Sequence, residues 1–314
     1  MSTALITHLA CLDHFMGPHH PESPHRLRAV LAALDAPEFS SLLREEAPQA
    51  TREELCRVHP REHVDEILAI RPAPGQGVAL DADTIMSAGS AEAALRAAGG
   101  ACAAVDAVLS GRANTAFAAI RPPGHHAEPD RAMGFCLFNN AAIAALHARA
   151  RWGLQRVAVL DFDVHHGNGT QAMFSDDANL FYASSHQSPC YPGTGHVRER
   201  GIAGNIVNAP LPPGADGAAF RAAWARIILP ALDAFAPELI IISAGFDAHE
   251  ADPLAQLNVQ TADYAWLTSE ILRIADIHTS GHVVSVLEGG YDLAALAAAT
   301  AAHVRVLMRV VGGG

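Results

Sequence analysis

Residues 156–169 read RVAVLDFDVHHGNG, so a short apolar run leads directly into two aspartates and two adjacent histidines. The run has the composition of a strand that is buried on both faces of a sheet. Side chains alternate between the faces of such a strand, which places Asp161, Asp163 and His165 together. Carboxylates at this depth cost several kcal/mol to desolvate unless they meet a cation or tight hydrogen bonds. The stretch therefore predicts a buried strand whose carboxyl end carries a polar site.

Similar apolar runs recur along the chain and alternate with segments of helical spacing. The apolar runs are 3–7, 115–120, 156–162, 179–184, 205–209, 238–246 and 282–290. The alanine- and leucine-rich segments between many of them are 88–109, 139–151, 217–235, 261–276 and 292–310. Because strands alternate with helices, the pattern predicts an α/β protein with a central, mostly parallel sheet covered by helices on both faces.

Three further apolar runs are followed by costly polar residues. RPPGHHAE follows one run and brings His125 and His126, and GFDAHEADP ends another and brings Asp247 and Asp252. The run HVVSVLEGG is followed by Tyr291. In open α/β sheets, ligands bind outside the carboxyl ends of the strands. We therefore expect four strand ends to share one rim.

A metal ion would satisfy this concentration of charge. Asp163 and His165 offer a carboxylate and an imidazole, and the third ligand is expected from Asp247 or Asp252, between which spacing does not decide. A sulfur-free set of nitrogen and oxygen ligands suits zinc, iron(II) or manganese, with one position open for water or substrate. In the alternative interpretation, the acids only cap the next helix and the histidines are solvated. Four polar strand ends on one rim favour a catalytic metal site.

The loop RPPGHH and the aromatic residue after EGG suggest catalytic groups beside that metal. Two prolines and a glycine stiffen the loop, so His125 and His126 could act as a general base and an electrostatic partner. Tyr291 follows two glycines, where its phenol could donate a hydrogen bond to a developing oxyanion. Without the neighbouring motifs, each of these residues would be as compatible with an ordinary loop.

The composition bounds the class of protein. The chain has 314 residues, half of them hydrophobic, and a net charge of −12 without any basic run, which argues against binding nucleic acid. The chain has no apolar stretch long enough to predict a membrane span and no basic start that would predict a secretory signal. A cytoplasmic protein is therefore expected. The five cysteines lack a CxxC pair and are expected to be reduced and mostly buried. The proline-rich stretch 71–77 is interpreted as a surface loop within one domain.

Six motifs follow one another along the chain: RPPGHHAE (121–128), GFCLFNN (134–140), DFDVHHGNGTQ (161–171), YPGTG (191–195), SAGFDAHEADPL (243–254) and EGGYDL (288–293). In their order and spacing the chain resembles the zinc-dependent histone deacetylase family, including its bacterial acetylpolyamine amidohydrolases. HHPESPHRL (19–27) is similar to the first loop of the class II branch. The resemblance implies one deacetylase domain over residues 1–314 with the arginase/deacetylase fold, a three-layer α/β/α sandwich.

The resemblance also implies a role for each site residue. It implies one zinc ion per chain, with iron(II) as an alternative, on Asp163, His165 and Asp252. It implies that His125 is an electrostatic partner, that His126 is the general base and that Tyr291 holds the oxyanion. Further members of the catalytic set are Asp161, which would orient His125, and Asn168, which stands where some relatives have an aspartate behind the second histidine.

Two further groups of residues follow from the same resemblance. A substrate tunnel is implied on Gly134, Phe135, Tyr191 and Leu254. A structural potassium or sodium ion is implied on Asp161, Asp163, His165, Ser184 and Ser185. His166, by contrast, is implied to be a supporting residue outside the ligand set.

The resemblance implies hydrolysis of an N-acetyl or short N-acyl amide, most readily acetyl-lysine in a protein or peptide. An acetylpolyamine is the second candidate substrate: polyamine-preferring relatives carry a glutamate where this chain has Leu254, but Glu22, His249 and Glu250 could place charge near the rim. A ureohydrolase with two manganese ions would need DxHxD where this chain has DxDxH. A non-catalytic acyl-binding protein is the other alternative. Bacterial relatives often associate, so a homo-oligomer is a further expectation, although no residue identifies an interface.

Overall fold

A single eight-stranded sheet forms the middle layer of the protein. The computed structural model describes residues 2–309. All neighbouring strands of this sheet are parallel. Their spatial order is β2 (Leu43–Glu46), β1 (Thr3–Thr7), β5 (Thr115–Ala118), β10 (Val283–Leu287), β9 (Leu239–Ala244), β6 (Val157–Asp161), β7 (Leu180–Gln187) and β8 (Ile206–Leu211).

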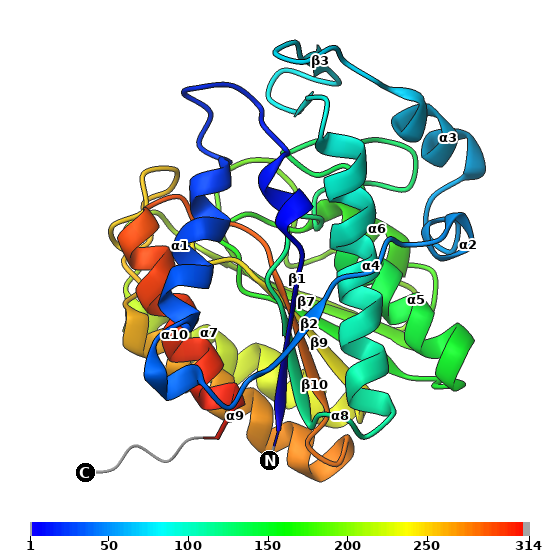
Figure 1. The fold of residues 1–314 in the computed structure, drawn as a ribbon. Coiled ribbons are helices and arrows are strands. Elements are labelled where there is room, and N and C mark those ends of the chain that lie inside the picture. Colours follow the sequence, from blue (N-terminus) through cyan, green and yellow to red (C-terminus); the bar gives the residue numbers. More distant parts are fainter. Residues whose placement is uncertain (1, 310–314) are drawn as a thin grey trace.

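Helices cover both faces of this sheet (Figure 1). One face carries α1 (Pro24–Leu34), α7 (Gly217–Ala223), α8 (Leu229–Phe235), α9 (Thr261–His278) and α10 (Leu293–Leu307). The other face carries α4 (Ser90–Leu109), α5 (Asn140–Trp152) and α6 (Asn168–Phe174). The predicted α/β/α sandwich is therefore confirmed.

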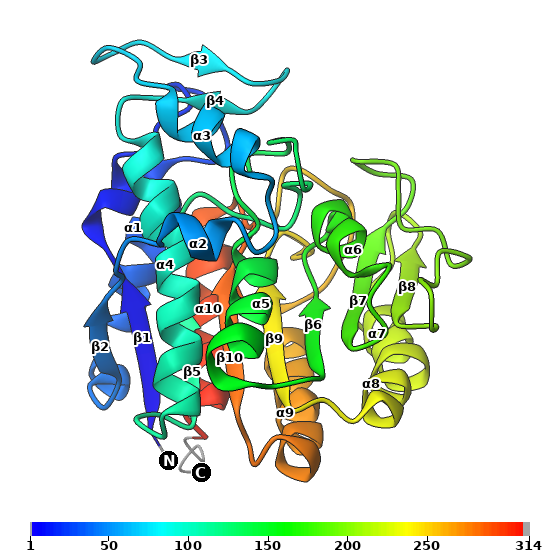
Figure 2. The ribbon, with the colours of Figure 1, turned by 90° about the vertical axis from the view of Figure 1, so that its right-hand side faces the viewer.

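Small elements lie outside these three layers. They are the antiparallel pair β3 (Val78–Ala79) and β4 (Ile85–Met86), the helices α2 (Arg52–Leu55) and α3 (Arg61–Ala69), the 3-10 helices η1 (Leu9–Leu12) and η2 (Pro37–Phe39), and the π-helix η3 (Trp224–Ile228). Figure 2 shows β3 and β4 beyond the carboxyl ends of the strands, at the top of the view. The pair β3 and β4 therefore lies at the end of the sheet at which a ligand is expected, whereas η3 continues the helical layer between α7 and α8.

All seven predicted strands are present. Each begins within two residues of its predicted start and ends within three residues of its predicted end. The four-residue edge strand β2 was not predicted because its sequence, LREE, has no apolar run: its residues are mostly exposed and are held by backbone pairing with β1. The predicted helix 217–235 is broken by η3, just before Pro230, which lacks the N–H that a regular α-helix would use. The predicted helix 292–310 ends at Leu307, and its last residue lies outside the described range.

Three other predictions from the sequence concern a loop, the cysteines and membrane spans. The stretch 71–77 is an exposed turn, as predicted. All five cysteines are free thiols, and three of them are buried. Among the helices of residues 2–309, none combines the length and the apolar character needed to cross a membrane.

Candidate active site

Four adjacent strands carry the polar residues that the sequence singles out. β5, β10, β9 and β6 are neighbours in the middle of the sheet, and they run parallel. Their carboxyl ends therefore meet at one edge, where the loops after them bring in the two histidines, Tyr291 and the aspartates. Every strand residue of β6 and β9 is buried, so the site rests on rigid, fully packed backbone.

The first histidine of the pair is held by the end of β6. Its Nδ1 lies 3.0 Å from Asp161 Oδ2, which also accepts a 3.0 Å hydrogen bond from the Tyr182 hydroxyl. Asp161 Oδ1 accepts the backbone N–H of Asp163. The other nitrogen, His125 Nε2, lies 3.7 Å from Asp163 Oδ2. Burial by itself would lower the pKa of His125, but the carboxylates of Asp163 and Asp161 outweigh it and raise that pKa to about 10.

The second histidine has a defined tautomer. Asn168 Nδ2 donates to Glu128 Oε1 at 2.8 Å, so the amide oxygen of Asn168 is the atom that faces His126 Nδ1 at 2.9 Å. Because that oxygen only accepts, Nδ1 carries the proton and Nε2 keeps a free lone pair. Burial, followed by the positive charges of His125 and His165, holds the pKa of His126 well below its usual value. His126 is therefore a neutral imidazole with one nitrogen able to take up a proton.

The candidate metal ligands form a compact group. His165 Nδ1 lies 3.1 Å from Asp163 Oδ1 and 3.2 Å from Asp247 Oδ2. These three residues are buried, and each offers one ligand atom within 4.8 Å of the others. Asp252 instead accepts the backbone N–H of Tyr291 at 2.7 Å and that of Leu254 at 3.0 Å. The structure thus brings Asp163 and His165 together with Asp247, whereas the carboxylate of Asp252 braces the backbone at Tyr291.

The charges and the space in this group fit a divalent cation. Burial, followed by repulsion from Asp163 and Asp252, raises the pKa of Asp247 to about 7. A Cβ at Gly245 would overlap Asp163 Oδ2, and a Cβ at Gly289 would overlap Asp247 Oδ2, so glycine at both positions lets the carboxylates approach. Crowded carboxylates beside one imidazole are the donor set that zinc or iron(II) accepts. The residues present therefore fit the metal that the resemblance implies.

Aromatic residues of the expected tunnel lie beside the candidate catalytic side chains. The Tyr191 ring meets the His126 ring edge-to-face at 5.1 Å, and the Phe135 ring meets Tyr291 in the same manner at 6.0 Å. Gly134 lies so close to His126 that an added Cβ would come within 2.5 Å of its ring. Tyr191 is 39% exposed, and Phe135 and Leu254 are half-buried. Three of the four expected tunnel residues, Gly134, Phe135 and Tyr191, thus lie against the side chain of His126 or Tyr291.

The residues expected to hold a monovalent ion lie on neighbouring strands. Ser184 pairs with Asp161 in the register of β6 and β7, and its hydroxyl lies 2.9 Å from His186 Nδ1. The hydroxyl of Ser185 accepts a hydrogen bond from the Trp224 indole. The structure therefore brings Asp161 and Ser184 side by side, while Ser185 already has a partner.

His166 lies outside the candidate ligand set. Its Nδ1 lies 2.7 Å from the Thr194 hydroxyl, and its Nε2 lies 2.9 Å from Gln171 Oε1. Burial, followed by the charge of His186, lowers the pKa of His166 to about 3. Both of its nitrogens are engaged, which matches the supporting role that the resemblance implies.

One of the expected rim charges is placed elsewhere by the structure. Glu22 is fully buried and paired with two arginines, so the expectation that it adds charge near the rim is wrong. His249 is half-buried and Glu250 is exposed, so these two stay compatible with a place near the rim. Glu22 precedes α1 and Arg26 lies in its first turn, and their spacing of four residues is the signal in the sequence for an ion pair.

Supporting residues that the sequence did not single out complete the site. Tyr182 holds Asp161, Glu128 orients Asn168, and Glu288 accepts the backbone N–H groups of Gly124 at 2.6 Å and His125 at 3.2 Å. Glu288 lies within the quoted motif EGGYDL, but its role depends on a loop 164 residues away. Nothing local in the sequence indicates such a contact.

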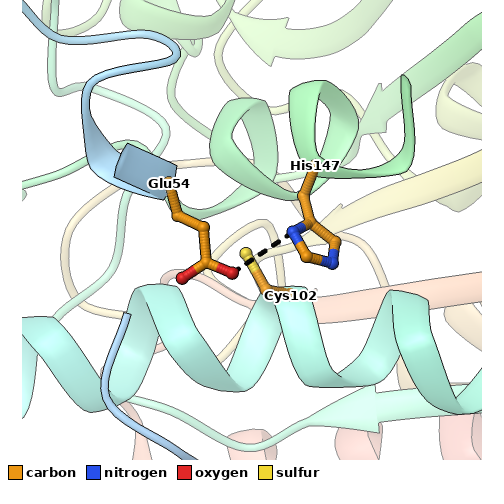
Figure 3. Close-up of side chains that lie close together, drawn as sticks. All are labelled: Glu54, Cys102 and His147. Carbon is orange, nitrogen blue, oxygen red and sulfur yellow. Dashed lines mark ion pairs between the residues drawn. The ribbon is translucent and has the colours of Figure 1, made fainter. Parts of the chain in front are cut away.

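A second group with metal-ligand chemistry lies between helices, away from the strand ends (Figure 3). Glu54, Cys102 and His147 come from α2, α4 and α5, and Glu54 Oε1 lies 3.3 Å from His147 Nδ1. Arg57 Nη1 donates to that same nitrogen at 2.9 Å, and Asp106 accepts from His147 Nε2 at 2.8 Å. The guanidinium already supplies the positive charge here, so this group is a polar junction of three helices.

Comparisons with known proteins agree with this geometry. A family model described as "Histone deacetylase domain" matches residues 20–307. The chain is 40% identical to a histone deacetylase-like amidohydrolase from Pseudomonas aeruginosa, over 92% of this chain and 82% of that protein. It is 39% identical to a probable deacetylase from Archaeoglobus fulgidus, over 93% of this chain and 82% of that protein. A solved structure, the HDA15 HD domain, superimposes with a TM-score of 0.91 at 38% identity, covering 98% of this chain and 88% of that one.

Metal content of two aspartate variants will decide between the candidate third ligands. Since the resemblance implies Asp252 as a ligand and Asp247 as a neighbour, Asp252→Asn should lose bound zinc on dialysis, whereas Asp247→Asn should weaken zinc affinity only about 10- to 100-fold. Zinc per chain, measured by atomic emission on both purified variants beside the unmodified protein, is the test. The reverse ranking would contradict the assignment of Asp252 and favour the group that lies closest together in the structure.

Proposed function

The chain belongs to the histone deacetylase family, and on that premise we propose that it is a zinc-dependent amidohydrolase. Its reaction would be the hydrolysis of N-acetyl or other short N-acyl amides, with acetyl-lysine in a protein or peptide as the substrate. The observation that carries the proposal is the pair of buried histidines after β5 beside a buried aspartate cluster after β6 and β9, all at one edge of the parallel sheet.

Asp163, His165 and Asp252 would hold the zinc ion, with Asp247 as the alternative third ligand. A zinc ion there would supply a Lewis acid for the amide carbonyl and for the attacking water. Iron(II) suits the same donor set. We also propose a potassium or sodium ion near the backbone of Asp161, Asp163, His165, Ser184 and Ser185, which is supported by the pairing of Asp161 with Ser184.

The two histidines would divide the proton chemistry. Nε2 of His126 would accept a proton from the attacking water and later deliver it to the departing amine, since Nδ1 is held by Asn168. His125, oriented by Asp161, would stabilise negative charge beside it. The amide C–N bond breaks, the oxygen of water joins the acyl carbon, and both of its protons pass to the departing nitrogen, so the products are a carboxylate and a protonated amine.

Tyr291 would donate its phenolic hydrogen to the developing oxyanion. Burial raises the pKa of this phenol well above its usual value, so it stays protonated, while Arg26 acts in the opposite direction. Its backbone N–H is fixed by Asp252, and helix α10 begins directly after it with Asp292 as the N-cap. The tyrosine is therefore anchored between the aspartate cluster and a helix start.

The walls of the site favour an acyl-lysine side chain. Phe135 and Tyr191 would pack along the aliphatic stem, and Gly134 would leave room beside His126. Leu254 is apolar, whereas a carboxylate at this position would attract a cationic polyamine. The burial of Glu22 removes one of the three rim charges that favoured the polyamine alternative.

Further parts of the proposal concern the whole chain. We treat residues 1–314 as one deacetylase domain, supported by a family match that begins at residue 20 and ends at residue 307. A cytoplasmic location is supported by five free thiols. Metal content near one ion per chain would separate this proposal from a ureohydrolase with two metal ions.

Removal of the Tyr291 hydroxyl should abolish most activity. Tyr291→Phe is expected to lower kcat on an acetyl-lysine peptide by about two to three orders of magnitude, the typical effect of losing one oxyanion donor. Zinc content should not change. Tyr264→Phe is a matched control, because the buried Tyr264 hydroxyl has no hydrogen-bond partner among residues 2–309. Equal activity of Tyr291→Phe and the unmodified protein would contradict the assigned role.

Substrate preference should follow the residue at position 254. The unmodified protein is expected to hydrolyse an acetyl-lysine peptide with a kcat/KM at least about tenfold above that for an N-acetylpolyamine. Leu254→Glu should narrow or invert this ratio, because a carboxylate attracts the cationic substrate, and Leu254→Gln should not. Preference of the unmodified protein for the polyamine would refute the acyl-lysine assignment in favour of the second candidate.

A further inference from the structure

A carboxylate from the N-terminal loop is buried behind the candidate active site. Glu22 is fully buried, and its Oε1 accepts hydrogen bonds from Arg26 Nη1 at 2.9 Å and Arg121 Nε at 2.5 Å. Its Oε2 accepts from Arg121 Nη2 at 2.6 Å and lies 3.5 Å from His14 Nε2. Burial by itself would raise the pKa of Glu22. The neighbouring positive charges, above all that of Arg121, outweigh burial and lower this pKa to about 2. One charged carboxylate therefore lies between two guanidinium groups.

One of these arginines is hydrogen-bonded to the loop that carries the candidate catalytic tyrosine. Arg26 Nε donates to the carbonyl of Gly290 at 2.6 Å, and Nη2 donates to the carbonyl of Glu288 at 2.5 Å. Its guanidinium carbon lies 4.8 Å from the centroid of the Tyr291 ring. The chain turns at Gly290 with φ of 126°, a conformation that glycine adopts readily. Arg26 thus contacts both the turn before Tyr291 and the face of its ring.

The other arginine belongs to the loop of the histidine pair. Arg121 lies four residues before His125 and donates to the carbonyls of Cys11 at 2.7 Å and His14 at 3.1 Å. Glu22 therefore connects the loop of the histidines with the loop of the tyrosine. Glu288 makes a second connection between the same loops through Gly124 and His125.

Arg26 can stay under the tyrosine ring only while its charge is balanced. Two guanidinium groups within reach of one another repel each other in a buried, low-dielectric environment. Glu22 is the carboxylate that contacts both, and Arg26 has a hydrogen-bonding carboxylate partner in no other described residue. Without the negative charge, the pair would separate, and Arg26 would move away from the loop of Tyr291.

We propose that Glu22 is a positioning residue for the deacetylation reaction, which acts through Arg26 to hold the Tyr291 hydroxyl at the developing oxyanion. This inference rests on the proposed function. Glu22 touches neither substrate nor metal in this arrangement. It determines where the oxyanion donor lies relative to the two histidines, and so links the first loop of the chain to its last catalytic motif.

A small displacement of a catalytic group is expensive, since about 1 Å can cost about 100-fold in rate. Glu22→Gln keeps the shape of the side chain and removes its charge. We expect it to lower kcat about 10- to 100-fold and to leave KM within about twofold, because the lost contact acts in the transition state. Zinc content should equal that of the unmodified protein. Asp263→Asn, which removes a buried carboxylate paired with Arg221 outside the site, should leave kcat unchanged.

A double-mutant cycle distinguishes positioning from a general loss of structure. If Glu22 acts through the Tyr291 hydroxyl, Glu22→Gln should change kcat by less than about twofold once Tyr291→Phe has removed that hydroxyl. A loss in the Tyr291→Phe background as large as in the unmodified protein would overturn the proposal, and so would full activity of Glu22→Gln. Full activity of Tyr291→Phe itself would instead contradict the proposed role of the tyrosine and hence the proposed function.

A second variant decides the question if Glu22→Gln does not fold. Arg26→Lys keeps the positive charge beside Glu22 but cannot donate to both loop carbonyls while lying flat beneath the ring. The same cycle with Tyr291→Phe applies: a loss of about tenfold or more that vanishes in the Tyr291→Phe background supports positioning, and an additive loss refutes it.

Discussion

Negative charge buried at the carboxyl ends of the adjacent strands β6 and β9 is the constraint on which the rest of the site depends. Asp161, Asp163 and Asp247 are almost completely buried, and Asp252 is 7% exposed. Two protonated histidines would balance only part of this charge, and water is largely excluded. A divalent cation would balance this charge, so the proposed metal would contribute to the stability of the site as well as to its chemistry.

Several features of the chain follow from the crowding of these buried carboxylates. Gly245 and Gly289 have no side chain because the carboxylates of Asp163 and Asp247 occupy the space. The hydrogen bonds of Tyr182 to Asp161 and of backbone N–H groups to Asp252 use the remaining lone pairs of those carboxylates. Outside the cluster, the deeper carboxylates of Glu22 and Glu288 tie the surrounding loops together. The acids of the site are thus linked through shared partners, since His165 contacts both Asp163 and Asp247, and His125 contacts both Asp161 and Asp163.

The sequence predicts the part of this network that is local. The alternation of DFDVH predicts that Asp161, Asp163 and His165 lie together, and they do, although β6 ends at Asp161 and the other two lie in the bend after it. The two histidines after RPPG follow from their motif. Pairing between distant parts of the chain could not be predicted. Glu22 pairs with Arg121, which lies 99 residues away in the sequence, so a carboxylate expected near the rim is instead buried in an ion pair. The choice of third ligand was open for the same reason, since Asp247 and Asp252 lie in one turn and only tertiary packing aims them. β2 was missed because an exposed edge strand has no apolar pattern.

The most direct test of the account is a zinc titration of chelator-treated protein, followed by hydrolysis of an acetyl-lysine peptide. If buried carboxylates and one imidazole hold a single catalytic zinc ion, activity should be absent after chelation and should return linearly until about one zinc ion per chain is bound. Full activity after removal of all metal, or a requirement for two ions per chain, would contradict the account.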